Sequence, residues 1–400
     1  MSRPNVPHRG QPRVVAVASH PIQYQAPWFR ALAASGDIDF SVVFIQQPNS
    51  QEQGRGFGVA FQWDIPLLEG YPWTVASDVG GPGGLSGFFA ARLRRPLALL
   101  SKLDPDILVL TGWHVWPLVQ MLMAARWAGV PVIMRGESNA LRARPWAVRT
   151  WHRLLLAACA AFLPIGRASR DFYRGYGIAE ERLFDTPYFV DNARFAAAAA
   201  AALPDRARLR AKWGVPQDAT CFCYAGKLEP KKRILDLLEA LRIAAARGAA
   251  MHLLVVGSGE LLAQAQSMVA AHGLPVSFAG FLNQTEIPGA YAATDCLVLP
   301  SDHGETWGLV VNEAMACGRP ALVSDRVGCA ADLVTDGETG ATFPFGDTAA
   351  LAQRLVDLAC DPARLAVMGA RARDRVVHGY SIEKSVEGTL RAVRFVAGRA

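Results

Sequence analysis

Two glutamates, Glu305 and Glu313, lie eight positions apart across the predicted start of a helix. An apolar run at 295–300 precedes them and is typical of a buried strand. Residues 308–316 suit a helix that a Gly-Arg-Pro sequence ends. Free N–H groups at a helix start bind phosphate, and carboxylates accept hydrogen bonds from hydroxyls. The pattern therefore suits a nucleotide sugar; the alternative is an ordinary strand-loop-helix unit with one capping and one surface glutamate.

A cluster of positive charge follows another predicted strand, 220–225. Four cations lie within residues 227–233, beside a glycine and a proline. Lysine is a usual point-charge partner for phosphate. The cluster stands at the carboxyl end of its strand, as Glu305 does, and open parallel sheets bind ligands at that edge. We interpret it as a phosphate-binding loop, with a solvated charged loop as the alternative.

The elements that position these residues form two sets, separated by a run of alanines at 196–202. Within each set, short apolar runs alternate with helical patterns, which predicts a parallel sheet covered on both faces. We expect an α/β protein with two tandem Rossmann-like domains facing a central cleft. Residues 1–192 would form the first domain, 193–381 the second, and 382–400 a helix crossing back to the first. The long irregular stretch 46–87 indicates a functional surface.

Composition narrows the classes of partner and compartment. Of the 400 residues, 51% are apolar and 19% charged, so a large core is available, and the net charge of +6 suits anionic partners. Seven scattered cysteines, an odd number, indicate buried thiols in a reducing compartment. No apolar run reaches the roughly 18 residues of a membrane span, and the first 13 residues lack a signal-peptide pattern. We therefore expect a cytoplasmic protein.

Residues 85–103 interleave phenylalanines and leucines with three arginines and a lysine. This pattern predicts a basic amphipathic helix. Such a helix can lie on an anionic membrane, which would make the protein peripheral at the inner face of the plasma membrane. The alternative is a helix that packs on its own domain with a solvated basic face, and most amphipathic helices pack inward.

Several motifs in a fixed order resemble the retaining glycosyltransferases of the GT-B fold, family four. They are Tyr188-Phe189-Val190-Asp191, Gly226-Lys227-Leu228-x-x-x-Lys232, Val256-Gly257-Ser258-Gly259, Phe278-Ala279-Gly280-Phe281, and Glu305-x7-Glu313 with the following Ala-Met-Ala-x-Gly-x-Pro. The resemblance covers roughly 160–390 well and the first domain loosely. It implies transfer of a sugar, with retention, from a nucleotide-diphosphate-sugar donor to a glycan or lipid-linked acceptor in cell-surface polysaccharide or glycoconjugate synthesis. The alternatives are a nucleotide-sugar-binding module without turnover and a GT-B epimerase.

The resemblance also implies roles for individual residues. Glu305 would contact the donor sugar and stabilise positive charge near its anomeric carbon, and Glu313 would bind the ribose hydroxyls. Lys227, where relatives usually have arginine, and Lys232 would contact the donor diphosphate. The other implied donor-site residues are Gly226, Gly257, Gly280, Phe281 and the backbone of Thr306, Trp307, Gly308 and Leu309.

The first domain departs from the family pattern. Where the family commonly has a catalytic-site histidine, this chain has Arg135-Gly136-Glu137-Ser138. Either Glu137 takes over the sugar contact, or the acceptor differs, or the register is shifted. His20 is the other candidate for the cleft, His114 suits either the core or an acceptor surface, and Arg135 is a candidate to neutralise a phosphate or an acidic acceptor.

We expect neither a metal nor another cofactor beyond the nucleotide sugar itself. Asp104-Pro105-Asp106 has the Asp-x-Asp spacing of a glycosyltransferase metal motif, but it precedes a strand. We interpret it as a turn, and expect the lysines and the helix start to stabilise the leaving diphosphate. The expected partners are the donor and the acceptor, and no nucleic acid.

Overall fold

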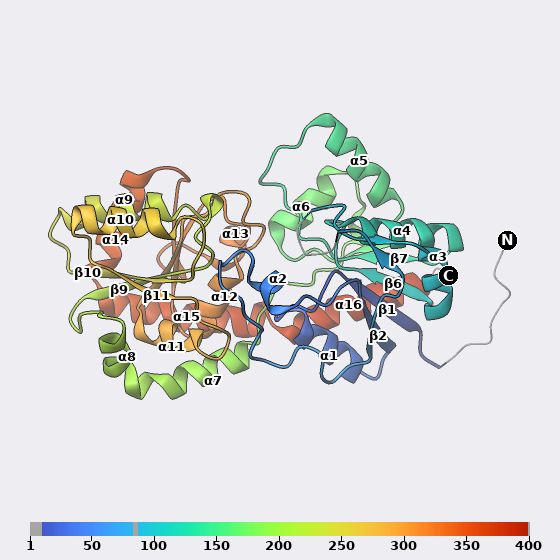
Figure 1. Ribbon diagram of the computed structural model, residues 1–400, viewed down its shortest axis with the longest axis horizontal. Helices are drawn as coiled ribbons and strands as arrows, with labels where there is room; N and C mark the ends of the chain where they lie inside the picture. The colour runs from blue at the N-terminus through green and yellow to red at the C-terminus, as the bar shows by residue number, and fades with distance from the viewer. Residues whose placement is uncertain (1–9, 83–86, 399–400) are drawn as a thin grey trace.

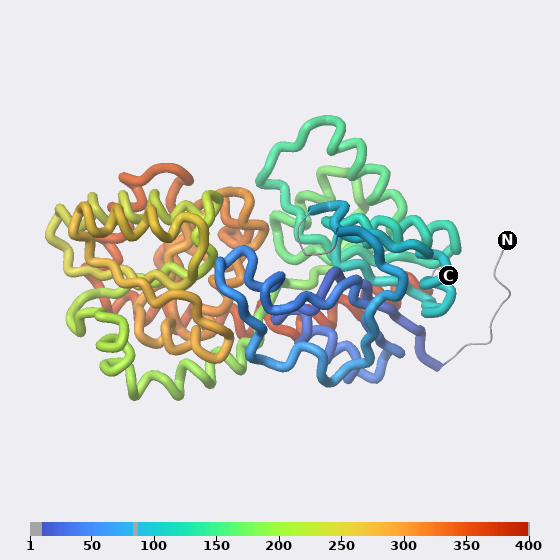
Figure 2. Tube along the Cα trace, in the orientation of Figure 1, coloured from blue at the N-terminus to red at the C-terminus, as the bar shows by residue number. Residues whose placement is uncertain are grey.

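The computed structural model describes residues 10–82 and 87–398, which form two α/β domains, each built on a parallel six-stranded sheet (Figures 1 and 2). The first sheet has the order β3 (Trp73–Val75), β2 (Asp39–Phe44), β1 (Arg13–Ala18), β6 (Ile107–Leu110), β7 (Val132–Met134), β8 (Ala161–Phe162). The second has the order β11 (Val276–Gly280), β10 (Met251–Val256), β9 (Thr220–Ala225), β12 (Cys296–Leu299), β13 (Ala321–Ser324), β14 (Gly340–Phe343). The predicted fold class is confirmed.

Helices cover both faces of each sheet, which is why the central strands are buried along their whole length. One face of the first sheet packs on α3 (Pro96–Leu103), α4 (Trp116–Ala128), α5 (Trp146–Ala157) and α6 (Arg167–Gly175), and the other on α1 (Ala26–Ala34) and α16 (Ile382–Ala397). One face of the second packs on α9 (Ile234–Ala245), α10 (Leu262–His272) and α14 (Thr348–Ala359), and the other on α7 (Asn192–Ala202), α11 (Ile287–Ala293) and α12 (Leu309–Ala316).

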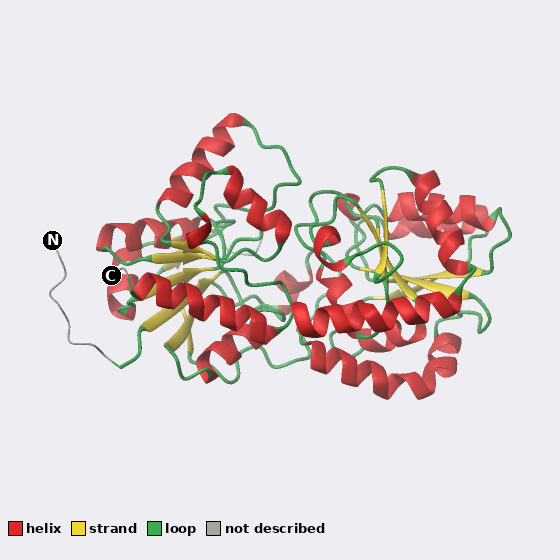
Figure 3. Ribbon diagram, turned by 180° about the vertical axis from the view of Figure 1, so that it is seen from behind, coloured by secondary structure: helices red, strands yellow, loops and turns green. Residues whose placement is uncertain are grey.

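The chain returns to the first domain through its last two helices. Helix α15 (Pro362–Gly379) packs on α12 of the second domain, and α16 packs on α1 of the first (Figure 3). Ser381 caps the start of α16 by accepting a hydrogen bond from the Lys384 N–H at 3.3 Å. A Cβ at Gly388 would lie 2.0 Å from the Asp185 carbonyl oxygen, so this glycine permits the close approach of α16 to the first domain.

The predicted amphipathic helix at 85–103 is wrong. Residues 92–93 form the short strand β5, which pairs with β4 (Val79–Gly80), and α3 begins only at Pro96. Proline fits the first turn of a helix but disfavours helical backbone at the residue before it, and Arg95 is accordingly non-helical, with φ −135°. The helix therefore cannot start earlier.

Some predicted ranges extend beyond the described residues. Residues 1–9 of the predicted first domain, 399–400 of the predicted last helix, and 85–86 of the predicted amphipathic helix lie outside them. Among the helices that the structure describes, none combines the length and apolar character needed to cross a membrane.

Candidate functional site

The loop between β12 and α12 carries Glu305 to the carboxyl edge of the second sheet. Gly308 precedes the helix with φ +99°, a conformation that favours glycine, and a Cβ there would lie 2.9 Å from the Leu299 side chain. No side chain caps α12, so its first N–H groups are available to an anion. The loop is fixed by backbone hydrogen bonds from Glu305 N–H to Asp302 and from Gly328 N–H to Glu305. The predicted helix start is confirmed.

The structure brings Lys232 and Glu305 together as an ion pair between the loops that follow β9 and β12. Their side chains are only 12% and 14% exposed, so water screens this pair less than a surface pair. Gly226, in the same loop, has φ +148°. A Cβ at this position would lie 3.8 Å from Cε and Nζ of Lys232. A cation and a carboxylate are therefore held side by side where two neighbouring strands end.

Three of the predicted glycines meet at the same edge of the second sheet. The Gly257 N–H donates to the Gly280 carbonyl at 2.7 Å, and a Cβ at Gly257 would lie 1.9 Å from the Gly226 carbonyl oxygen. Any side chain at Gly257 would thus push the loop carrying Lys227 away. Burial, together with the nearby lysines, lowers the pKa of Lys227. The loops after β9, β10 and β11 form one compact surface.

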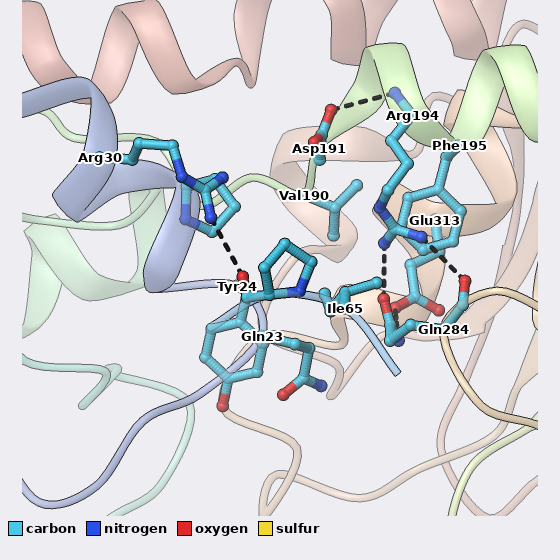
Figure 4. Close-up of a pocket in the computed structure, with 12 residues that line it drawn as sticks. Gln23, Tyr24, Arg30, Ile65, Val190, Asp191, Arg194, Phe195, Gln284 and Glu313 are labelled. Carbon is cyan, nitrogen blue, oxygen red and sulfur yellow. Dashed lines mark hydrogen bonds between the residues drawn. The ribbon is translucent and has the colours of Figure 1, made fainter. Parts of the chain in front are cut away.

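Glu313 lies deeper, beside a cavity of about 110 Å³ between the domains (Figure 4). It is 7% exposed, and burial raises the pKa of its carboxyl group. The Tyr291 hydroxyl donates to it at 2.8 Å, and the Gln284 amide lies 3.5 Å away. Arg194 in turn donates to Gln284 at 2.6 Å. The Glu313 carboxylate borders the cavity but already has protein partners, so its ribose role stays a prediction.

Trp307 is buried at the junction of the two domains, so only its backbone is available for the predicted donor contact. Its side chain is 2% exposed, and its indole N–H donates to Asn312 Oδ1 at 2.8 Å. A Cβ on Gly166 of the first domain would lie 2.3 Å from this ring, so the indole packs directly against the other domain. The amide of Asn139 reaches the Thr306 carbonyl oxygen at 3.1 Å across the same junction. The loop between β12 and α12 therefore lies where the two domains meet.

The first domain faces this loop with a second cavity, of about 350 Å³. Glu137 accepts hydrogen bonds there from the Tyr188 hydroxyl and, at 3.4 Å, from Thr306 of the second domain. His20 and His114 line the same cavity, and Ser19 Oγ lies 3.0 Å and 3.4 Å from their rings. The structure thus brings Glu137 and His20 together, and places His114 on the cavity wall.

Arg135 is enclosed by aromatic rings, and its role in neutralising a phosphate or an acidic acceptor stays a prediction. It is 2% exposed, and its guanidinium lies 4.8 Å from the ring centres of both Trp28 and Tyr188. Arginine stacks on aromatic faces in this way because its cation is planar and weakly hydrated. The sequence showed a cation after β7, but nothing in it located the two rings that enclose the side chain.

Sequence reasoning also missed a segment, residues 57–64, that extends from the first domain onto the second (Figure 2). Phe57 and Phe61 contact Phe281 with ring centres 5.0 Å and 4.3 Å apart, and Lys227 Nζ lies 5.1 Å from the Phe57 ring centre. Asp64 accepts from the Thr285 N–H at 3.2 Å. This crossing segment therefore covers two predicted donor-site residues. The glycine-rich stretch indicated a functional surface, but not which surface it would contact.

The Asp-x-Asp sequence belongs to a turn. Asp104 ends α3 in a left-handed conformation, and Asp106 accepts the Arg13 N–H at 2.8 Å. Across residues 10–82 and 87–398, no group of three or more His, Cys, Asp or Glu side chains is arranged to hold a metal ion. Metal independence itself stays a prediction.

The protonation of His20 predicts a loss of stability in acid. Burial, with a smaller contribution from His114, lowers the pKa of His20 to about 4 from its ordinary value of 6.5. The folded protein therefore favours the neutral ring, and this contribution to stability is full above pH 6.5 and is lost as the pH falls towards 4. We expect the free energy of unfolding, measured with urea, to decrease over that interval.

The control for this expectation is His20→Gln, which should decrease the slope between pH 6.5 and 4. His152, whose pKa burial also lowers to about 4, should leave a residual slope in that variant. An unchanged slope in His20→Gln would contradict the assignment to His20. Activity should show no inflection near pH 6.5 from this residue.

Comparison with known proteins places both halves of the chain in described families. Residues 21–188 match the model of a glycosyl transferase 4-like domain, and residues 205–375 match the model of glycosyl transferases group 1. The D-inositol 3-phosphate glycosyltransferase of Rhodococcus jostii is 27% identical over 97% of this chain and 90% of its own length. A GDP-mannose-dependent alpha-(1-6)-phosphatidylinositol monomannoside mannosyltransferase of Mycolicibacterium smegmatis is 33% identical over 47% of this chain and 50% of its own length.

Solved structures share the fold at low identity. A glycosyltransferase from Rickettsia africae superposes with a TM-score of 0.75 and 14% identity, covering 98% of this chain and all of that one. Anabaena HepE in complex with UDP and glucose gives a TM-score of 0.71 and 17% identity, over 94% and 98% of the two chains. The two-domain arrangement is therefore that of GT-B proteins.

Proposed function

The chain belongs to the glycosyl transferases of group 1 and is an enzyme that uses nucleotide-sugar donors, and we propose that it transfers the sugar with retention to a glycan or lipid-linked acceptor. The proposed setting is cell-surface polysaccharide or glycoconjugate synthesis. The observation that carries the proposal is the Lys232–Glu305 ion pair beside the uncapped start of α12. Retention rests on the resemblance to family four.

We propose that the donor diphosphate contacts Lys232 and the N–H groups at the start of α12. Both carry positive charge that offsets the charge of the leaving group. In the reaction, the bond from the anomeric carbon to the diphosphate oxygen breaks, and the acceptor oxygen bonds to that carbon. The acceptor's proton leaves with the diphosphate. Glu305 stabilises the positive charge on the anomeric carbon while the first bond is breaking.

We propose that the acceptor binds in the cavity of about 350 Å³, which we call the acceptor cavity. The residues that line this cavity favour an uncharged sugar as the acceptor. Its lining contains Glu137 and two histidines, and no lysine or arginine. Burial lowers the pKa of both histidines, so they are neutral at pH 7 and offer no charge to a phosphate. His20, with its pKa of about 4, is a hydrogen-bond partner for a hydroxyl and a weak base. Trp113, on the same wall, offers an apolar ring to a sugar.

We propose that residues 1–192 bind the acceptor and residues 193–381 the donor, in a cytoplasmic protein. The seven cysteines are all free and six are buried, which supports a reducing compartment. We also propose that residues 87–103 contact an anionic membrane. This proposal now rests on Phe89, which is 69% exposed, and on the exposed Arg92, Arg94 and Arg95 rather than on a helix.

The test is to measure release of nucleoside diphosphate and the sugar product for UDP- and GDP-sugars, each with neutral glycosides and with phosphorylated polyols. We expect one donor class to be turned over with a neutral sugar acceptor, giving a product of retained configuration. Anionic polyols should be poor acceptors. Isomerised nucleotide sugar without transfer would point to an epimerase, and binding without turnover would contradict the proposal.

The crossing segment predicts a competition with the nucleotide. It contacts Phe281 and Lys227, which we propose hold the base and the diphosphate. Asp64→Ala removes its hydrogen bonds to Thr285. Each such bond contributes about 0.5–1.5 kcal/mol, so the dissociation constant for nucleoside diphosphate should fall roughly 2- to 10-fold in titration calorimetry.

The matched control is Glu69→Ala, which removes an exposed acid from the same loop region. It should leave the dissociation constant within about twofold of wild type, because single surface substitutions away from such contacts have small effects. Weaker binding in Asp64→Ala would mean that the segment closes over the bound nucleotide, contrary to the prediction.

A further inference from the structure

Helix α5 presents an apolar face to solvent. Its buried residues are His152, Leu155 and Leu156. On its outer side, Trp146 is 80% exposed, Leu154 65% and Trp151 40%. Leu154 lies eight residues after Trp146, which is two steps from i to i+4, so the two side chains lie on the same side of the helix. Figure 1 shows α5 standing out from the body of the first domain. An outward-facing stripe of this kind calls for a physical explanation.

Both charged side chains of α5 are positive. Arg149 and Arg153 follow one edge of α5 at a spacing of four residues, and both are exposed. From residue 138 to 170 the sequence has six arginines and no aspartate or glutamate. Basic side chains beside exposed tryptophans are the composition of helices that lie in the interface of an anionic bilayer.

The neighbouring helix in the same layer adds to the exposed apolar surface. α4 packs in the same core cluster as α5, on one face of the first sheet. Trp127 on α4 is 84% exposed and Met123 is 58% exposed. The first domain therefore exposes large apolar side chains on more than one helix.

We propose that α5 docks the enzyme on an anionic lipid bilayer, with Trp146, Trp151 and Leu154 entering the interface and Arg149 and Arg153 contacting lipid headgroups. A second copy of the chain fits this face poorly, because a symmetric contact would bring the same arginines together. The surface is close to the acceptor cavity in sequence, since α5 begins nine residues after Glu137.

The test is flotation of the full-length protein with phosphatidylcholine vesicles, with and without phosphatidylglycerol. Wild type should float with the anionic vesicles alone, and less so at high salt. Trp146→Ser with Leu154→Ser should weaken the partition roughly 10-fold or more, because it removes most of the inserted apolar area. Arg149→Glu with Arg153→Glu should weaken it at least as much, since each cation near an anionic surface changes binding several-fold.

The matched control is Val367→Ser with Val377→Ser, which removes exposed apolar side chains from α15 in the second domain. It should float like wild type, and all variants should keep wild-type thermal stability and nucleotide binding. These readouts separate loss of docking from misfolding, and none depends on the transfer reaction.

Three results would overturn the proposal. The first is wild type that does not float with anionic vesicles. The second is wild-type flotation of the α5 variants while Arg92→Glu with Arg94→Glu and Arg95→Glu abolishes it, which would assign docking to residues 87–103. The third is a wild-type dimer that the α5 substitutions convert to a monomer, which would assign this face to a second copy.

Discussion

Replacing Lys232 with alanine is expected to weaken binding of the nucleotide-sugar donor by roughly 10- to 100-fold. Hydrogen bonds to charged groups contribute about 1.5–3 kcal/mol, which corresponds to that range. The side chain is only 12% exposed, so water replaces the lost cation poorly. Titration calorimetry with nucleoside diphosphate, at two salt concentrations, measures the change.

Lys231→Ala provides the matched control. Lys231 is the preceding residue, is 46% exposed and pairs with Glu229 at 3.2 Å, so its removal changes the net charge of the loop equally. We expect its effect to stay within about threefold at physiological salt, because exposed charges are screened. Equal effects for both lysines would show that the general charge of the loop, rather than the position of Lys232, attracts the donor.

Replacing Glu305 with glutamine is expected to decrease kcat roughly 100- to 1000-fold, the range for loss of one electrostatic contact to a transition state. Glutamine keeps the size of the side chain and an oxygen that can accept a hydrogen bond from Lys232, but it removes the charge. The anomeric carbon becomes positive only as the bond to the diphosphate breaks, so the loss should affect kcat more than donor binding.

Steady-state kinetics and nucleotide titration together distinguish these effects for Glu305→Gln. Glu229→Gln is the control, because it removes a partly exposed carboxylate from the neighbouring loop. It should retain kcat within about threefold of wild type, as surface substitutions usually have small effects. An increase in KM with unchanged kcat in Glu305→Gln would contradict a role in the reaction step.

The convergence of Lys232, Glu305 and the start of α12 could be predicted from the order of the strands, although the two side chains are 73 positions apart in sequence. Glu305 and the start of α12 belong to one strand-loop-helix unit, and Lys232 follows a strand that pairs with β12. Parallel strands bring such loops to one edge of the sheet, so spacing and topology suffice.

The contacts between the two domains could not be predicted in this way, because the domains have separate sheets and no strand pairing links the segments that meet. Glu137 meets Thr306, and Asp64 meets Thr285, across the junction of the two domains. The enclosure of Arg135 could not be predicted for the same reason, because its charge is visible in the sequence and the two rings around it are not. The helix predicted at 85–103 is wrong for a local reason, because Pro96 disfavours helical backbone at Arg95 and so sets the start of α3.

The crossing segment has a kinetic consequence. Residues 57–64 belong to the first domain yet rest on Phe281 of the second domain, which we propose holds the donor, so we expect a nucleotide sugar to load only while this segment is displaced. The cavity that we propose receives the acceptor includes Thr306, so it is complete only when the two domains meet. Binding should therefore be sequential and ordered, donor first, and the spent nucleotide should be the last product to dissociate. Product inhibition by that nucleotide should be competitive against the donor and noncompetitive against the acceptor.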